Sequence, residues 1–265
     1  MADADGPGPG LKSLDAALGV LGHMTRAEGA QSLSEIARAC GMPRSKVHRY
    51  LASFVQAGLV QQHGRSGRYD LGREAIHLGL SAIARHDFVN HAAEDLPDLA
   101  ARSGMTVLLS VWGNDGATVV RWERGASPTV TSMGLGTTLP LLNSATGRGF
   151  LAWAPGGAIA AIQEQELRRA ARNPLLLPDA PPTRAGLREL IARLRARGYA
   201  SVDGGFIPGL VAIAAPILDW QDEAQAVVTL IGVDPAAIEP GSASVQLLRD
   251  YCASKSLRTP NPATP

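Results

Sequence analysis

Apolar residues recur every three or four positions in two neighbouring stretches near the start of the chain, which predicts two short helices joined by a tight turn. Ser32 and Glu35 have the spacing of a capping box at the start of the first helix, and Gly41 ends it. Pro43 suits the first position of the second helix, where no backbone hydrogen bond is lost. The apolar side of this second helix, residues 43–57, carries Val47, Tyr50, Leu51, Phe54 and Val55.

The opposite side of helix 43–57 is polar and cationic toward its N-terminal end. A helix that lies in the major groove of DNA needs short polar and basic side chains there. An ordinary helix pair with a solvated face has the same pattern, so this side alone leaves DNA binding open. The residues that would lie nearest to DNA are Arg44, Ser45, Lys46, His48 and Arg49.

A third helix and a hairpin flank this pair. Two short extended runs surround a Gly/Ser turn in residues 59–71, which is a hairpin signal, and the turn carries Arg65 and Arg68. Three helices followed by a basic hairpin predict a winged helix-turn-helix over residues 11–72, although arginines in an isolated turn are usually only solvated. The first helix would pack against the pair through Leu11, Leu14, Leu18 and Leu21.

The rest of the chain predicts a linker helix and an α+β domain. Residues 73–87 are apolar on more than one side, which favours contact with a second chain as well as their own. Residues 88–258 then alternate strands and helices, with antiparallel hairpins that indicate one antiparallel sheet. Strands are expected at 106–112, 117–123, 199–203, 210–218 and 224–233, and helices at 88–101 (kinked at Pro97), 148–154, 158–171, 184–197 and 242–257.

Composition and charge narrow the possible functions. The net charge is only +1, but residues 44–73 carry six Lys/Arg against a single acid, Asp70, which is the footprint expected for a phosphate backbone. Cys40 and Cys252 fit small buried residues better than a disulfide or a metal site. No signal peptide and no apolar run of about 18 residues occurs, so we expect no membrane contact and a cytoplasmic protein. Residues 1–10 and 259–265 are expected to be disordered.

Enzymatic chemistry finds little support in the sequence. There is no Gly-x-Ser-x-Gly elbow, no phosphate-binding loop and no His/Cys metal spacing. All six histidines lie in the first 91 residues, so the expected C-terminal domain contains none. We therefore predict no catalytic residues, no metal and no cofactor. A small-molecule-binding or enzymatic protein without DNA binding, and a pure protein-interaction module, remain the alternatives.

Several short motifs lie in order along the chain, and each alone is of low specificity. They are Ser-Leu-Asp-Ala-Ala-Leu at 13–18, Leu-Ser-Glu-Ile-Ala-Arg-Ala-Cys-Gly-Met-Pro-Arg-Ser-Lys-Val-His-Arg at 33–49, Gly-Arg-Tyr-Asp-Leu-Gly at 67–72, Leu-Pro-Leu at 139–141, Ser-Ala-Thr-Gly-Arg-Gly at 144–149, Arg-Gly-Tyr-Ala at 197–200, and Pro-Gly-Leu-Val-Ala-Ile-Ala-Ala-Pro-Ile at 208–217.

Taken together, these motifs resemble the IclR family of bacterial transcriptional regulators over residues 11–257. The resemblance implies a winged helix-turn-helix, a linker helix and a GAF-like effector-binding domain. It also implies a homodimer or a dimer of dimers that binds a double-stranded DNA operator, usually as a repressor. Lys46 stands where relatives often have Thr, so the operator sequence could differ from theirs.

The resemblance also places a small-molecule effector in the C-terminal domain. The loop before a helix would hold it through exposed N–H groups and the helix dipole, opposite residues of the sheet. Relatives often have more polar residues at Leu142 and Ala212, so we expect a larger and more apolar ligand here, such as an aromatic acid or a lactone. The same loop residues could simply cap a structural helix. The effector-binding candidates are Asn143, Ser144, Ala145, Thr146, Asp203, Ala212, Thr229 and Ile231.

Overall fold

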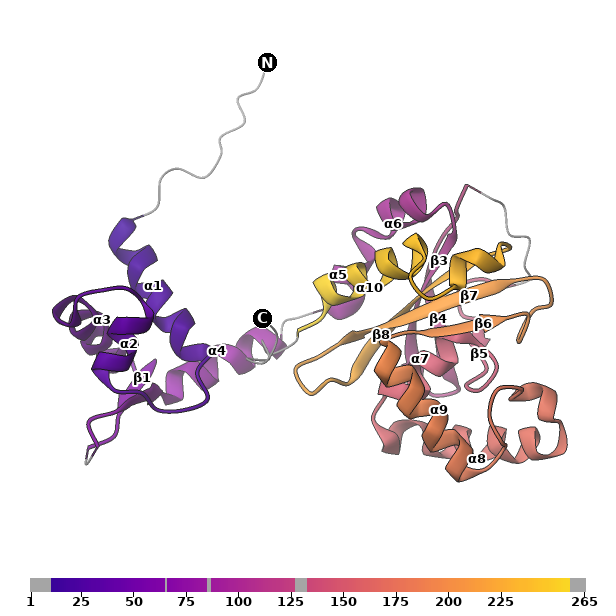
Figure 1. Ribbon diagram of the computed structural model, residues 1–265, viewed down its shortest axis with the longest axis horizontal. Helices are drawn as coiled ribbons and strands as arrows, with labels where there is room; N and C mark the ends of the chain where they lie inside the picture. Colours follow the sequence, from indigo (N-terminus) through magenta and orange to yellow (C-terminus); the bar gives the residue numbers. More distant parts are fainter. Residues whose placement is uncertain (1–10, 65, 85–86, 127–132, 258–265) are drawn as a thin grey trace, which may run out of the picture. The chain divides into compact units, whose positions relative to one another are not determined.

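The computed structural model of the chain describes residues 11–64, 66–84, 87–126 and 133–257 (Figure 1). These residues fall into two compact units, one that ends at residue 84 and one that begins at Asp87. The predicted disordered ends, 1–10 and 259–265, lie outside the described residues, as do residues 127–132 of the Thr- and Gly-rich stretch at 127–139, which the sequence predicts to be extended.

The N-terminal unit is a winged helix-turn-helix followed by a linker helix. Ser32 and Glu35 form the predicted capping box at the start of α2. Val47 and Leu51 of α3 are fully buried and pack with Ile36 of α2. The elements are α1 (Lys12–Thr25), α2 (Leu33–Ala39), α3 (Arg44–Gln56), β1 (Val60–Gln62), β2 (Tyr69–Leu71) and α4 (Arg73–Ala84).

The predicted packing stripe of α1 is wrong. Leu11, Leu14 and Leu18 have exposed fractions of 72%, 51% and 52%, and only Leu21 packs partly against the core. The buried face of α1 consists of Ala17, Val20 and Met24 instead. This face has the same helical spacing, and its smaller first residues allow α1 to approach the helix pair closely.

Two details of α3 also differ from the prediction. Pro43 is the N-cap, with extended backbone at ψ 139°, and the helix begins at Arg44. Val55 is 39% exposed, whereas Phe54 in the same last turn of α3 packs against the core.

The C-terminal unit is built on the predicted antiparallel sheet. Six strands lie in the order β5-β4-β3-β8-β7-β6. Alternate residues of the central strand β3 face opposite sides, so Leu108 belongs to one apolar cluster and Val107 and Leu109 to another. The strands are β3 (Thr106–Gly113), β4 (Gly116–Glu123), β5 (Thr138–Leu139), β6 (Ala200–Asp203), β7 (Val211–Leu218) and β8 (Ala224–Gly232).

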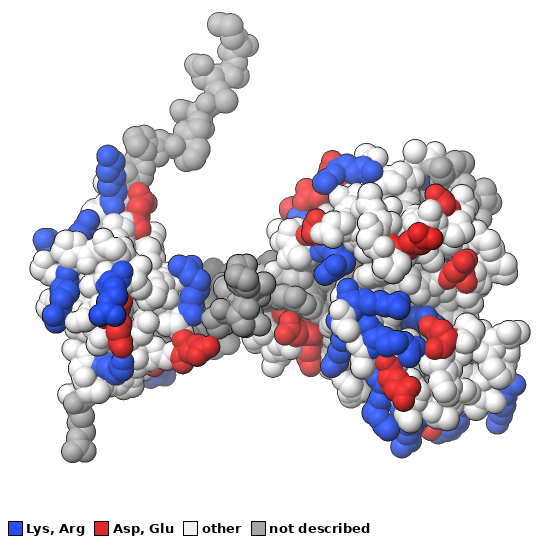
Figure 2. Space-filling model, in the orientation of Figure 1, with Lys and Arg blue, Asp and Glu red and all other residues white. Residues whose placement is uncertain are grey.

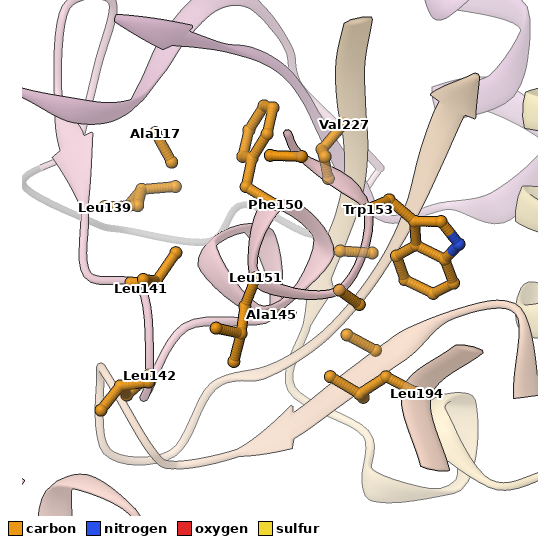
Figure 3. Close-up of a cluster of buried hydrophobic side chains, with 14 of the residues drawn as sticks. Ala117, Leu139, Leu141, Leu142, Ala145, Phe150, Leu151, Trp153, Leu194 and Val227 are labelled. Carbon is orange, nitrogen blue, oxygen red and sulfur yellow. The ribbon is translucent and has the colours of Figure 1, made fainter. Parts of the chain in front are cut away.

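Helices cover both faces of this sheet, which gives three layers (Figure 1). One face carries α5 (Phe88–Ala93), α6 (Leu96–Ser103) and α10 (Ala243–Lys255). The other carries α7 (Ala145–Trp153), α8 (Gly156–Arg172) and α9 (Arg184–Arg197). In Figure 3, Phe150 of α7, Leu139 and Val227 gather between α7 and the sheet. Short 3-10 turns occur at Pro174–Leu176 and Pro235–Ile238.

Two predicted helices have different boundaries. The single kinked helix expected at 88–101 is two helices, α5 and α6, and Pro97 lies in the first turn of α6, where proline is tolerated. The helix expected from Arg148 begins at Ala145, because Ser144 is its N-cap and its Oγ accepts a hydrogen bond from the Gly147 N–H at 2.9 Å. No helix in the described part of the chain has both the length and the apolar character needed to cross a bilayer.

Candidate DNA interface and effector pocket

The outer face of α3 brings the predicted DNA-contacting residues together. Arg44, Ser45, Lys46, His48 and Arg49 are all exposed, on a helix whose inner side is fully buried at Val47 and Leu51. Basic side chains are spread over the visible face of this unit (Figure 2). None of the described residues forms a hydrogen bond or an ion pair with the Arg49 guanidinium. The face is therefore free to bind an external anionic partner.

The turn between α2 and α3 fixes this face. The Met42 N–H donates to the Ala37 carbonyl at 3.0 Å, and Gly41 has a φ of +62°. That left-handed conformation favours glycine. Since α3 starts directly after Pro43, its first-turn N–H groups lie beside Arg44 and Ser45, which suits phosphate binding.

The predicted wing is a two-stranded hairpin with a tight tip. β1 pairs antiparallel with β2, and the His63 N–H donates to the Arg68 carbonyl at 2.8 Å. Gln31, just before α2, exchanges backbone hydrogen bonds with Tyr69 at 2.7 and 2.9 Å. The hairpin is thus tied to the segment that starts α2. Arg65 lies outside the described residues.

Arg68 is partly exposed, and its guanidinium is paired with a carboxylate of α2. Its Nη2 lies 3.0 and 2.8 Å from the two carboxylate oxygens of Glu35. The same carboxylate accepts a hydrogen bond from the Ser32 N–H at 2.7 Å. Sequence reasoning missed this pair, because residues 33 positions apart give no local signal. A contact between Arg68 and DNA stays a prediction.

Glu35 makes the stability of this unit sensitive to acid. The hydrogen bonds from the Ser32 backbone and from Arg68 lower its pKa from 4.5 to about 2. Because the pKa is lower in the folded than in the unfolded chain, this stabilisation is complete above about pH 4.5 and is lost as the pH falls toward 2. We expect Glu35→Gln to lower the melting temperature at neutral pH, and by less as the pH approaches 2. A melting-temperature difference that stays constant with pH would contradict this assignment.

A small apolar cavity lies between the start of α7 and the sheet. Its volume is about 40 Å³, room for a few water molecules. Six of the eight effector candidates line it, whereas Asn143 and Asp203 do not. The lining residues among the candidates are Ser144, Ala145, Thr146, Ala212, Thr229 and Ile231.

The hydroxyl groups in this cavity are already paired with the protein. Thr146 Oγ1 and Thr229 Oγ1 lie 2.7 Å apart, in hydrogen-bond contact. Ser144 Oγ donates to the Pro140 carbonyl at 2.5 Å and caps α7. No charged side chain lines the cavity.

The loop before α7 is held by internal charges. The Glu166 carboxylate accepts from the Leu141 and Leu142 N–H groups at 2.8 and 3.0 Å. The buried Arg148 donates to the Leu142 carbonyl at 2.7 Å and pairs with Asp179 at 2.6 Å. A carboxylate of the chain itself therefore binds the two N–H groups that directly precede the predicted anion cradle at 143–146.

The two effector candidates outside the cavity have other positions. Asn143 donates to the Gly205 carbonyl at 3.1 Å and lines a neighbouring polar pocket together with Glu166 and Arg169. Asp203 is exposed at the end of β6, because alternate residues of a strand face opposite sides and Val202 takes the inward position.

Sequence reasoning missed most of the apolar lining. Phe206, Ile207 and Leu210 come from one Gly/Pro-rich segment after β6, where large apolar residues are unusual for a surface loop and were the available signal. Leu108, Met133, Leu139 and Val202 complete the wall.

The described residues contain no cluster of three or more His, Cys, Asp or Glu side chains that could hold a metal ion. Both cysteines are free in the structure. Burial raises the pKa of the Cys252 thiol and, to a smaller extent, that of Cys40, so neither thiol is activated as a nucleophile.

Comparison with known proteins agrees with this architecture. The family model described as the IclR helix-turn-helix domain matches residues 13–64, and that of the bacterial transcriptional regulator IclR C-terminal domain matches residues 80–251. The transcriptional repressor IclR of Escherichia coli (strain K12) is 27% identical over 234 residues, covering 87% of this chain and 84% of that protein. A glycerol operon regulatory protein of Streptomyces coelicolor is 29% identical over 209 residues, 79% of this chain and 80% of that one.

Solved structures give the same result. The crystal structure of Pseudomonas aeruginosa HmgR superposes with a TM-score of 0.79 at 33% sequence identity, over 93% of this chain and 97% of that chain. The two family models, the relatives and the solved structure thus agree on the family and the fold. The chain belongs to the IclR family of DNA-binding transcriptional regulators, with an effector-binding C-terminal domain.

Proposed function

We propose that this regulator represses transcription by placing α3 in the major groove of its operator, and that a small molecule bound beside α7 changes its operator affinity. The observation that carries the first part is the free cationic face of α3 opposite a fully buried inner side. Arg49 is our candidate for base readout, because a guanidinium can make two hydrogen bonds to guanine. Arg44, Lys46 and the first-turn N–H groups would hold phosphates.

The proposal requires a homodimer, because a palindromic operator presents two half-sites. Exposed leucines on α1 and exposed Ile76, Leu78 and Leu80 on α4 support it, with exposed fractions between 51% and 72%. Apolar helix faces of this extent are typical of protein interfaces. A second copy of the chain is the partner that explains apolar side chains on more than one side of α4.

Introducing charge on α1 should therefore disrupt the dimer. We expect the double substitution Leu14→Glu and Leu18→Glu to lower the molar mass measured by sedimentation equilibrium toward that of one chain. The matched control is Leu175→Glu, since Leu175 is 79% exposed in the C-terminal unit. An unchanged molar mass in the α1 variant would assign the interface elsewhere.

The lining of the cavity favours a neutral, mainly apolar effector over an acid. A carboxylate would enter without a cation to compensate its desolvation, since no charged side chain lines the wall and Arg148 of α7 is paired with Asp179. One hydrogen bond is available by rearranging the Thr146–Thr229 pair. A ligand with an aromatic ring needs more space than this cavity has, so Phe206 and Ile207 would have to move. Their segment lies between Gly204 and Gly209, which have φ angles of +62° and +78°.

A matched pair of ligands tests this preference. We expect methyl benzoate to raise the melting temperature of the full chain, and benzoate at the same concentration to raise it much less. Ala212→Leu, which fills the cavity, should abolish the shift. A larger shift with benzoate would contradict the neutral effector, and no shift with either would contradict a pocket that opens for an aromatic ring.

The relatives of this chain described above are transcriptional regulators, which favours a non-enzymatic role. Contact with chromosomal DNA places the proposed site of action in the bacterial cytoplasm. The ligand would act through its different affinities for two arrangements of the dimer.

A further inference from the structure

We propose that Arg68 is a positioning residue that clamps the wing to α2 through Glu35, instead of a DNA contact. The inference rests on the proposed docking of α3, because the wing acts in relation to that helix. It concerns an ion pair between the capping box and the residue that directly precedes β2, near the hairpin tip, and it changes what a basic residue in this wing is expected to do.

The geometry of the pair supports the clamp. One nitrogen, Nη2, contacts both oxygens of Glu35, at 3.0 and 2.8 Å. Arg68 Nε is buried and has no hydrogen-bond partner among the described residues. The guanidinium is therefore held on one side by the carboxylate and covered at Nε by protein, while the side chain as a whole is 40% exposed.

Glu35 is itself held in place from two sides. Its carboxylate accepts from the Ser32 N–H at 2.7 Å, and its own N–H donates to Ser32 Oγ at 3.3 Å. A carboxylate fixed by a capping box at the start of α2 is a rigid anchor. Because α2 packs against α3 and the two are joined by a tight turn, an anchor on α2 is also fixed relative to α3.

The backbone beside Arg68 carries the clamp into the wing. The Arg68 carbonyl accepts from the His63 N–H and closes the hairpin tip, and the next residue, Tyr69, pairs with Gln31. The Gln31–Tyr69 bridge and the buried side chains of Val60 and Tyr69 attach the strands of the hairpin to the helices. The Arg68–Glu35 contact adds a side-chain attachment nearer the tip, where β1 and β2 have ended.

The two roles of Arg68 predict opposite effects of Glu35→Gln on DNA binding. Glutamine keeps the capping box, since Glu and Gln both serve at that position. If Glu35 clamps the wing, neutralising it weakens operator binding. If Glu35 instead competes with DNA for Arg68, neutralising it frees the guanidinium and strengthens binding.

The experiment measures binding of the full chain to duplex DNA from upstream of its own gene and to a random duplex of equal length, by fluorescence anisotropy at several salt concentrations. We expect Glu35→Gln and Arg68→Gln each to weaken binding to the upstream duplex by about three- to tenfold, the double variant to be no weaker than either single one, and random-duplex affinity to change less. Arg68→Lys should restore most of the loss, because a single nitrogen makes both contacts.

Several outcomes would overturn the clamp. If Arg68 contacts a phosphate, Arg68→Gln will reduce the slope of log affinity against log salt concentration by about one, and Glu35→Gln will tighten binding. Additive losses in the double variant, or no change in any variant, would also exclude it. Melting curves show whether Glu35→Gln unfolds the chain. If it does, the comparison of Arg68→Gln with Arg68→Lys, which both leave the capping box intact, tests the clamp. Loss of binding in Arg49→Ala, measured alongside, tests α3 docking separately.

Discussion

Replacing Arg49 by alanine is expected to weaken binding to the operator by about 1–3 kcal/mol, roughly five- to 150-fold, with a smaller loss on random DNA. The reason is that Arg49 is exposed in the middle of the α3 outer face and has no partner among the described residues. Removal of a bidentate contact to guanine also relaxes sequence preference at that base pair. Anisotropy titrations with both duplexes at fixed salt measure the two effects.

Arg102→Ala is the matched control for Arg49→Ala. Arg102 is also an exposed helical arginine, but it lies on α6 of the C-terminal unit and pairs with Asp98 at 3.3 Å. We expect this variant to bind both duplexes as the unmodified chain does. An equal loss on both duplexes in Arg49→Ala would reassign Arg49 to a phosphate, and no loss would exclude α3 as the reading helix.

Gly147→Ala is expected to destabilise the C-terminal unit by about 3 kcal/mol or more, and to lower its melting temperature by roughly 6–12 °C. A Cβ at this position would lie 2.0 Å from the Pro140 carbonyl oxygen and 2.6 Å from the Leu141 Cα. Both are backbone atoms, and Glu166 holds the same loop through the Leu141 N–H. The backbone must therefore shift at the wall of the effector cavity. We expect calorimetry to show the lower melting temperature, and methyl benzoate to raise that temperature by less than in the unmodified chain.

Gly157→Ala provides the control on the neighbouring helix. A Cβ on Gly157, in the first turn of α8, meets no atom within 4 Å. Alanine is the better helix former, so we expect a neutral or stabilising effect of about 0.4–1 kcal/mol. If Gly147→Ala were equally harmless, the close packing of α7 against the 140–141 loop would not be required for stability.

Most helices and strands could be predicted from the sequence, because each is specified by residues that are close together in the chain. The capping box of α2, the antiparallel hairpin of β3 and β4, and the core positions Val47 and Leu51 are set by spacings of a few residues. The prediction starts α7 at Arg148, three residues too late, because the sequence leaves open whether Ser144 caps a helix or binds an effector.

The predictions that were wrong or missing concern which face of a helix is buried and which residues far apart in the sequence contact each other. The leucines of α1 have a regular helical spacing, yet Ala17, Val20 and Met24 are buried, since the sequence cannot tell an interface between copies from the core. The Arg68–Glu35 pair joins residues far apart in the chain. Thr146 and Thr229, which the family resemblance names as effector candidates, both line the cavity, but their mutual hydrogen bond has no signal in the sequence.

The most direct test of DNA docking by α3 is methylation interference on duplex DNA from upstream of the chain's own gene, because guanine N7 lies in the major groove. We predict interference at two symmetric groups of guanines about one helical turn apart, with at least one position in each group lost in Arg49→Ala. Binding that is insensitive to N7 methylation throughout, or an interference pattern unchanged by Arg49→Ala, would contradict the account.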